Sequence, residues 1–269
     1  MVKDKVVIIT GASSGIGKAC AVAFARMKAG VVISGRNEQN LLNAEAELKK
    51  INTNVLSVKC DVSNANDCRR LVEETIKKFG KIDVLINNAG MSMRAILDEV
   101  ELNVLKKIMD INFWGTVYCT KFALPYLLDT KGSVVGISSV AGKKGLPGRS
   151  GYSASKFAME GFLETVRTEN IKKGLHVLVV CPGFTASNIR NTALSKDGSV
   201  QGESPRDESK MMSADVVAGK IVDAVQKRKR DLILTTNGKF TVLMNTFFPA
   251  WMDKLVYNHM AKEKDSPLK

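Results

Sequence analysis

Residues 6–17 read VVIITGASSGIG, and this segment is the most informative about the fold of the chain. It opens with an apolar run that is typical of a strand buried on both faces. Gly11, Gly15 and Gly17 follow the run and precede the helical stretch KACAVAFARM. Glycines at such a junction allow a tight turn and a close approach of the backbone to a pyrophosphate, which N–H groups at the helix start can bind. The stretch therefore predicts a nucleotide site, with a purely structural glycine turn as the alternative.

The rest of the chain repeats this alternation of strand and helix. Short runs rich in Val and Ile, such as VLVVC at 177–181, are separated by longer amphipathic stretches. The pattern is typical of parallel strands joined by crossover helices that cover both faces of a sheet. It predicts an α/β fold, with a single Rossmann-like doubly wound parallel sheet of about seven strands. The strands are expected at residues 5–10, 31–34, 54–60, 83–87, 133–139, 175–181 and 231–235.

Composition and charge limit the classes of partner. The 269 residues are 45% hydrophobic and 25% charged, as in ordinary globular proteins. The 40 Lys and Arg against 27 Asp and Glu give a formal net charge of +13, which attracts anionic ligands. Outside a basic block at 227–230 the positive residues are scattered and are not interleaved with aromatic ones. No nucleic-acid partner is therefore expected.

The cysteines and the start of the chain bear on the compartment. The five cysteines are odd in number and lack CxxC spacing, so we expect reduced, buried thiols and no metal site. Residues 1–4 lead directly into the first strand, and no apolar run approaches the roughly 20 residues of a membrane span. The sequence therefore predicts a cytoplasmic protein without a signal peptide.

The end of the second predicted strand bears on the choice of nucleotide. NAD sites place an Asp or Glu there to bind the ribose 2′-hydroxyl, whereas a 2′-phosphate requires a cation. This strand ends in SGRN at 34–37 and carries no acid. Arg36 can bind a phosphate through its planar guanidinium. The sequence therefore favours NADP(H), unless Arg36 is an ordinary surface residue.

Tyr152 and Lys156 are the clearest candidates for acid–base chemistry. They are four residues apart at the start of a stretch with helical periodicity, so both side chains lie on one face of the helix. A phenol has an ordinary pKa of about 10, and a neighbouring positive charge lowers that pKa by stabilising the phenolate. Taken alone, the pair is equally compatible with two surface residues.

Five landmarks, in order, make the chain resemble the short-chain dehydrogenase/reductase family over nearly its whole length. Each is modest by itself, but each stands in the structural context that the family requires. They are TGASSGIG at 10–17, Asp61-Val62 after the third strand, NNAG at 87–90 after the fourth, Ser138-Ser139 thirteen residues before Tyr152, and Cys181-Pro182-Gly183 after the sixth. Within the family, the chain is most similar to the hydroxysteroid-dehydrogenase-like branch.

The resemblance implies an oxidoreductase that interconverts a ketone or aldehyde and an alcohol by hydride transfer. It implies a catalytic tetrad of Asn112, Ser139, Tyr152 and Lys156. The thirteen-residue separation from Tyr152 selects Ser139 over Ser138. Tyr152 would protonate the carbonyl oxygen and Ser139 would hydrogen-bond to it. Lys156 would hold the nicotinamide ribose, and Asn112 would support a water path to Lys156.

The resemblance also implies which residues contact NADP(H). They are Gly11, Ser13, Ser14, Ile16, Arg36, Asp61, Val62, Asn87, Ala89, Gly90, Tyr152, Lys156, Gly183 and Thr185. A catalytically silent NADP(H)-sensing or scaffold protein on the same fold is the alternative. The enzyme is favoured, because a binding protein has no chemical reason to keep the four tetrad residues in register.

The substrate is expected to meet three segments that follow the cofactor landmarks. These are residues 91–93, residues 142–146 and the polar stretch 190–213, which is long enough to be a lid. Met91 and Met93 suit an adaptable apolar pocket, and equally they suit the core. The predicted substrate is a small-molecule carbonyl compound or alcohol, apolar and steroid- or lipid-like.

The C-terminal residues 237–269 are expected to extend a catalytic domain at 1–236. Large apolar side chains concentrate at 237–260, and Pro249 divides them, which predicts two short helices. We expect their apolar surface to pack on the domain or on another subunit of a homodimer or homotetramer. Peripheral contact with a membrane is the alternative, since the basic block at 227–230 lies nearby.

Overall fold

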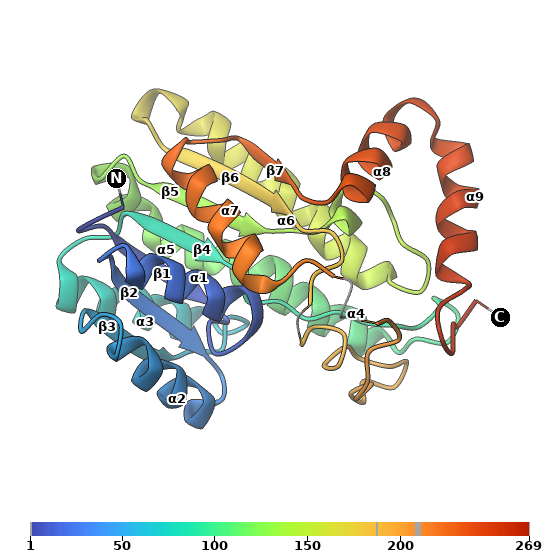
Figure 1. Cartoon of the computed structure of the whole chain (residues 1–269), viewed down its shortest axis with the longest axis horizontal. Coiled ribbons are helices and arrows are strands. Elements are labelled where there is room, and N and C mark those ends of the chain that lie inside the picture. The colour runs from blue at the N-terminus through green and yellow to red at the C-terminus, as the bar shows by residue number, and fades with distance from the viewer. Residues whose placement is uncertain (1, 187, 208–210, 269) are drawn as a thin grey trace.

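One parallel sheet forms the centre of the molecule. The computed structural model describes residues 2–186, 188–207 and 211–268. The seven strands of the sheet follow the order β3-β2-β1-β4-β5-β6-β7 (Figure 1). They are β1 (Val6–Thr10), β2 (Gly30–Gly35), β3 (Val55–Lys59), β4 (Val84–Asn87), β5 (Ser133–Ile137), β6 (His176–Cys181) and β7 (Asp231–Ile233). Each lies within two residues of a predicted strand, and the doubly wound fold is confirmed.

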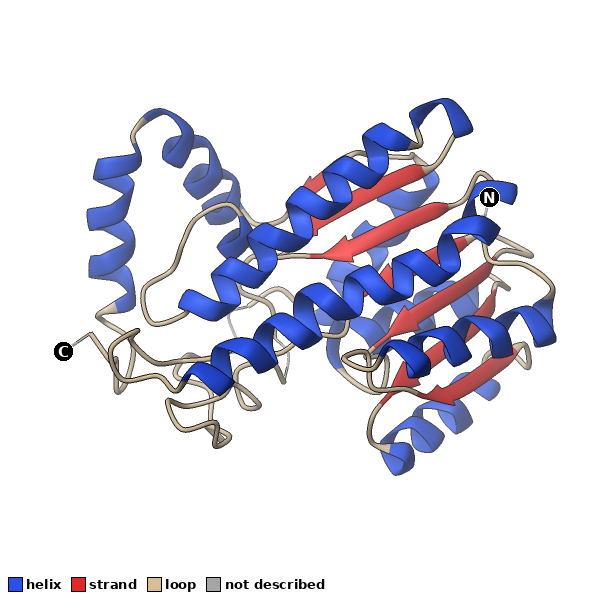
Figure 2. Ribbon diagram, turned by 180° about the vertical axis from the view of Figure 1, so that it is seen from behind, coloured by secondary structure: helices blue, strands red, loops and turns tan. Residues whose placement is uncertain are grey.

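Helices cover both faces of the sheet because its strands are apolar on both sides. In β1, Val7 and Ile9 face one layer and Ile8 faces the other. The layer beside Val7 holds α1 (Gly15–Arg26), α2 (Glu38–Lys49) and α7 (Ala214–Gln226). The opposite layer, nearer the viewer in Figure 2, holds α3 (Ala65–Phe79), α4 (Leu102–Met109), α5 (Gly115–Asp129) and α6 (Ser150–Glu169). The described residues also form short helical turns, namely η1 (Asp110–Trp114), η2 (Val140–Gly142) and η3 (Ile171–Lys173).

The winding of the chain reverses at β1. This strand pairs with β2 on one side and with β4 on the other. The connections that leave β1 and β4 therefore diverge at the carboxyl ends of the strands. In doubly wound sheets such a reversal opens the crevice in which ligands bind.

The segment between β6 and α7 is irregular. Among its described residues, Thr185 pairs with Met212, and Leu194 pairs with both Met93 and Val200 in isolated bridges. Ser213 ends the segment and caps α7. Residues 208–210 of the predicted lid lie outside the described residues.

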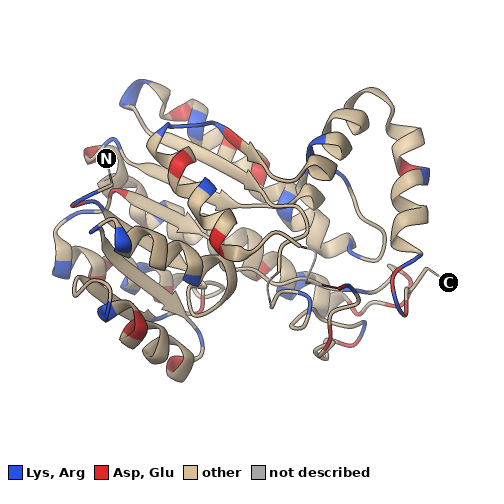
Figure 3. Ribbon diagram, in the orientation of Figure 1, with Lys and Arg blue, Asp and Glu red and all other residues tan. Residues whose placement is uncertain are grey.

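The C-terminal residues form the two expected helices, α8 (Thr236–Phe247) and α9 (Pro249–Met260), which project from the body in Figure 1. The buried side chains of α9 pack against Leu146, Met244 and Leu268. Figure 3 shows few charges on the two helices. Large apolar side chains stay exposed on them: Phe240, Leu243, Phe247, Phe248, Trp251, Leu255 and Tyr257. None of the helices that the structure describes has both the length and the apolar composition to cross a membrane. The domain boundary at residue 236 stays a prediction.

The five cysteines are free and buried, as the sequence predicts. Burial raises the pKa of the Cys20 thiol to about 12. Burial likewise raises the pKa of Cys181, and the nearby Glu160 carboxylate adds to the effect. The Cys20 and Cys181 thiols are therefore protonated, unreactive parts of the core.

Candidate active site

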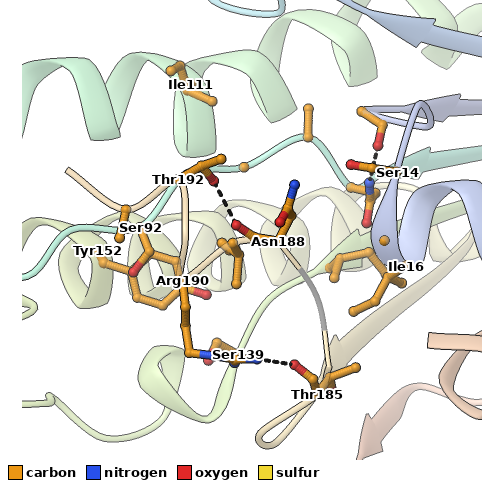
Figure 4. Close-up of a pocket in the computed structure, with 18 of the residues that line it drawn as sticks. Ser14, Ile16, Ser92, Ile111, Ser139, Tyr152, Thr185, Asn188, Arg190 and Thr192 are labelled. Atoms are coloured by element: carbon orange, nitrogen blue, oxygen red, sulfur yellow. Dashed lines mark hydrogen bonds between the residues drawn. The ribbon is translucent and has the colours of Figure 1, made fainter. Parts of the chain in front are cut away.

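A cavity of about 800 Å³ opens at the carboxyl ends of the strands (Figure 4). Most of the predicted cofactor and catalytic residues line it. They are Gly11, Ser13, Ser14, Ile16, Arg36, Asp61, Val62, Ala89, Gly90, Ser139, Tyr152, Lys156, Gly183 and Thr185. Asn87 and Asn112 do not line the cavity and are buried beside it.

The turn between β1 and α1 depends on glycine in two ways. Gly11 and Gly15 have φ angles of 63° and 54°, in the left-handed region that glycine tolerates. A Cβ on Gly11 would lie 2.8 Å from the Cα of Ala89, and one on Gly17 would lie 2.4 Å from Asn88 Nδ2. The turn is therefore pressed against the chain that follows β4.

The N-terminus of α1 differs from those of its neighbours. Asn37, Asn64 and Ser213 each cap their helix with a side-chain oxygen. Ser14 at the start of α1 makes no such bond. Its side chain and that of Ser13 line the cavity, so the first N–H groups of α1 suit an anionic ligand.

Arg36 follows β2 and is exposed at the rim of the cavity. Among the described residues, no hydrogen bond or ion pair engages its guanidinium. Asp61, after β3, also lines the cavity, and its carboxylate accepts hydrogen bonds from the Ser63 amide at 3.0 Å and hydroxyl at 2.7 Å. At the nucleotide end of the cavity, the Arg36 guanidinium therefore has no partner among the described residues, whereas the Asp61 carboxylate already accepts hydrogen bonds.

The two asparagines after β4 have different places. Asn87 points towards α5 and donates to Thr120 Oγ1 at 3.0 Å, and its own Oδ1 has no partner among the described residues. Asn88 lines the cavity, and its Nδ2 donates to the carbonyls of Thr10 at 2.8 Å and Gly11 at 3.0 Å. Asn88 therefore fixes the glycine turn, a role that sequence reasoning missed although its position in NNAG signals it.

Tyr152 and Lys156 lie on the first turns of α6, and both are buried. Their relative exposures are 9% and 2%. The ammonium of Lys156 lies 5.7 Å from the centroid of the Tyr152 ring and donates to the Ile137 carbonyl at 2.8 Å. Because both side chains are buried, the alternative that Tyr152 and Lys156 are surface residues is wrong. A phenol and a cation face one cavity from one helix.

Burial dominates the titration of both groups. It raises the pKa of the Tyr152 phenol, while the Ser139 hydroxyl and the Arg149 charge act in the opposite direction. It lowers the pKa of Lys156 to about 8, with the Glu160 carboxylate opposing that shift. A lysine with this pKa changes charge just above neutral pH, as acid–base sites require.

The two serines after β5 are distinguished by their partners. Ser138 donates its hydroxyl to Glu160 Oε1 at 2.5 Å. Ser139 accepts the Ala141 N–H at 3.1 Å and interacts with Tyr152. Ser138 is therefore engaged by the helix behind it, and Ser139 is the serine available beside the phenol, as Figure 4 shows.

Asn112 lies in η1, a π-helical turn between α4 and α5. It is fully buried; its amide exchanges hydrogen bonds with the main chain of Met91 at 2.8 and 2.9 Å and donates to Ser155 Oγ at 2.9 Å. Asn112 therefore connects the chain after β4 with the residue next to Lys156. Single π turns inside helices are frequent at functional sites.

The predicted substrate segments contribute in part. Ser92 and Leu146 line the cavity, and so do Arg190 and other residues of the predicted lid. Met91 and Met93 belong to the core, so they are core residues, the alternative that the sequence left open. Arg206, which also lines the cavity, belongs to that lid, whereas sequence reasoning missed Arg149 and Phe184.

Fold and cavity together define a dinucleotide-binding α/β protein of the oxidoreductase type. Residues 5–198 match the short chain dehydrogenase family. Dehydrogenase/reductase SDR family member 7B of Mus musculus is 34% identical over 270 residues, 98% of this chain and 84% of that protein. The 11-beta-hydroxysteroid dehydrogenase 1A of Arabidopsis thaliana is 36% identical over 264 residues, 94% of this chain and 75% of that protein.

Two solved structures share the fold. An alcohol dehydrogenase from Thermococcus sibiricus complexed with 5-hydroxy-NADP has a TM-score of 0.76 at 25% identity, covering 86% of this chain and 95% of that one. A short chain dehydrogenase/reductase from Burkholderia phymatum in complex with NAD has a TM-score of 0.83 at 24% identity, covering 93% and 95%. The chain belongs to the short chain dehydrogenase family, in its hydroxysteroid-dehydrogenase-like branch.

Proposed function

We propose that this protein is an NADP(H)-dependent oxidoreductase that interconverts a ketone or aldehyde and an alcohol. One observation carries the proposal. The phenol of Tyr152 lies in one cavity with Ser139 and Lys156, across from the glycine turn of α1 (Figure 4). An acid, a hydrogen-bond donor and a cation thus surround the place where a carbonyl oxygen would bind.

The residues at the nucleotide end fit a nicotinamide dinucleotide. The uncapped start of α1 and the left-handed Gly11 suit a pyrophosphate. Arg36 supports the choice of NADP(H), since it lines the cavity where the 2′-phosphate would require a cation. The two solved neighbours hold one NADP derivative and one NAD, so the choice depends on this residue.

The chain's own residues supply the proton chemistry. Bound NADPH supplies the hydride in the direction of reduction. Tyr152 holds the proton that the carbonyl oxygen gains, and Ser139 donates a hydrogen bond to the same oxygen. Negative charge develops on that oxygen in the transition state, where fixed donors stabilise it most. In alcohol oxidation, Tyr152 accepts the proton instead.

Lys156 and Asn112 support these steps. The positive charge of Lys156 favours loss of the phenolic proton, and the family resemblance gives it the nicotinamide ribose as a partner. Asn112 holds the segment beside Lys156 through Ser155. The resemblance also gives Asn112 a water path that returns protons to Lys156.

The substrate class follows the relatives and the cavity wall. Leu146, Phe184 and Ile189 contribute apolar side chains to the lining of the cavity. One relative is named a hydroxysteroid dehydrogenase. We therefore propose an apolar, steroid- or lipid-like carbonyl compound or alcohol.

The test is consumption of NADPH and NADH with an 11-ketosteroid and with 2-decanone. We expect reduction of at least one ketone, with kcat/KM higher for NADPH by about tenfold or more. Equal rates with the two cofactors would contradict the role of Arg36. A protein that is thermally stabilised by NADPH but transfers no hydride in either direction would be the silent binding protein instead.

We also propose that a second copy of the chain covers the exposed apolar face of α8 and α9, in a homodimer or homotetramer. Seven large apolar side chains of these helices are 38–67% exposed, which is typical of interaction surfaces. Gel filtration without detergent should give an oligomer. Flotation of the protein with liposomes would favour the membrane alternative. The cytoplasmic location stays a prediction.

A further inference from the structure

Three arginines surround one buried carboxylate at the substrate end of the cavity. The Glu263 side chain, just after α9, is 4% exposed. Its oxygens lie 2.7 Å from Arg206 Nε, 3.3 Å from Arg149 Nη2 and 3.6 Å from Arg94 Nε. The arginine side chains are 17%, 11% and 8% exposed. One negative charge is thus shared by three positive charges that bulk water hardly reaches.

Within the part of the chain that the structure describes, the other contacts of these arginines involve no further carboxylate. Arg149 donates to the Met93 carbonyl at 3.1 Å, and Arg94 donates to the Lys264 carbonyl. Arg206 lies 3.1 Å from His259 Nε2 and stacks 3.9 Å above the centroid of the Phe184 ring. Three guanidinium groups against one carboxylate leave an excess of two positive charges in this cluster.

Part of this excess positive charge lies at the wall of the cavity. Arg149 and Arg206 line it, and Arg149 stands three residues before Tyr152. Its charge reaches the phenol, because it opposes the burial that raises the pKa of Tyr152. Among the described lining residues Asp61 is the one acid, and it lies after β3 at the nucleotide end.

Uncompensated buried charge is costly unless a counter-ion completes it. The phosphates of a bound dinucleotide would not serve as the counter-ion of these arginines. Ser14 and Ile16 of the glycine turn lie on the opposite side of the cavity from Tyr152 in Figure 4. Guanidinium groups bind carboxylates and phosphates through paired, charge-assisted hydrogen bonds. A second anion at Arg149 and Arg206 would therefore come from the substrate.

We propose that the substrate carries an anionic group, a carboxylate or a phosphate, which Arg149 and Arg206 bind while its carbonyl group lies at Tyr152. This inference rests on the proposed oxidoreductase function and narrows its substrate class. Leu146 and Ile189, which line the same cavity, offer apolar contacts to the rest of the substrate. The substrate is then an amphipathic anion rather than a neutral lipid.

The test compares three matched ketones with NADPH: 4-acetylbenzoate, 4-acetylphenyl phosphate and methyl 4-acetylbenzoate. We expect kcat/KM for at least one anion to exceed that for the neutral ester by about tenfold or more. The better of the two anions identifies the group that the site prefers. In Arg206→Gln this anion-to-ester ratio falls about tenfold, and Arg206→Lys restores part of it. Arg230→Gln is the matched control, because exposed Arg230 pairs with Glu164 away from the cavity, and it keeps the wild-type ratio.

The outcomes separate this inference from the proposed function. An ester reduced as well as the anions, with the ratio unchanged in Arg206→Gln, overturns the anion site and leaves the oxidoreductase in place. If none of the ketones is reduced, the proposed function loses support, and calorimetry of the two anions with the NADPH-loaded protein decides the site. Binding that weakens in Arg206→Gln supports it, and absence of binding overturns it. If NADPH no longer stabilises Arg206→Gln, that variant is misfolded, and the anion and the ester are compared in Arg206→Lys instead.

Discussion

The two ends of the cavity are built from different parts. The nucleotide end uses backbone geometry from one short stretch, the left-handed Gly11 and Gly15 and the uncapped start of α1. The carbonyl end uses side chains from distant segments, such as Arg149 before α6 and Arg206 held by Glu263. The backbone suits the pyrophosphate, which all dinucleotides share. The side chains at the other end contact the substrate, whose chemical groups vary. Changes at the two ends should therefore affect different kinetic constants.

The largest effect is expected at the chemical centre between the two ends. Tyr152→Phe removes the proton donor and leaves the glycine turn intact, so turnover should fall about 10²- to 10⁴-fold. The dissociation constant for NADPH, measured by calorimetry, should stay within a few-fold of wild type. Substantial residual turnover would remove Tyr152 from the role of acid.

A smaller effect is expected at the nucleotide end. Arg36→Gln removes the unengaged cation, and hydrogen bonds to charged groups contribute about 1.5–3 kcal/mol. The ratio of NADPH to NADH affinity should therefore fall about 10- to 100-fold, since 1.4 kcal/mol is a factor of ten. Titration of each cofactor measures it. Arg26→Gln, exposed at the far end of α1, is the control and should keep the wild-type ratio.

The smallest effect is a shift in pH dependence. The Glu160 carboxylate raises the pKa of Lys156 against burial, which lowers it to about 8. Lysine is charged below its pKa, so activity that needs the charged form is lost as pH rises through that value. Glu160→Gln should move this loss to lower pH.

Profiles of kcat against pH check this prediction. Glu164→Gln, one turn further along α6 and exposed, should leave the profile unchanged. An identical profile for Glu160→Gln would mean that its carboxylate does not act on Lys156.

The nucleotide end was largely predictable from sequence because its signals are local. A strand, three glycines and a helix start lie within residues 6–17, and the periodicity of Val and Ile marks the strands. The different places of Asn87 and Asn88 could not be predicted in this way. Two adjacent asparagines look alike in sequence, but strand alternation turns Asn87 towards Thr120 and leaves Asn88 at the glycine turn.

The cluster of Arg94, Arg149 and Arg206 around Glu263 could not be predicted, because its residues meet only in the folded chain. Arg149 and Glu263 are 114 residues apart. No spacing rule connects an arginine before a helix to an acid after the last one. For the same reason the sequence predicts an apolar substrate, whereas the folded cavity adds the guanidinium groups of Arg149 and Arg206 to its lining.

Transfer of deuterium from NADPH to a ketone tests whether the two ends of the cavity form one hydride-transfer site. NADPH carrying deuterium at the transferable C4 position is incubated with the protein and 4-acetylbenzoate or an 11-ketosteroid, and the alcohol is analysed by mass spectrometry. We expect one deuterium on the former carbonyl carbon with wild type and almost none with Tyr152→Phe. Cofactor oxidation without deuterium in the product, or equal transfer by the variant, would contradict it.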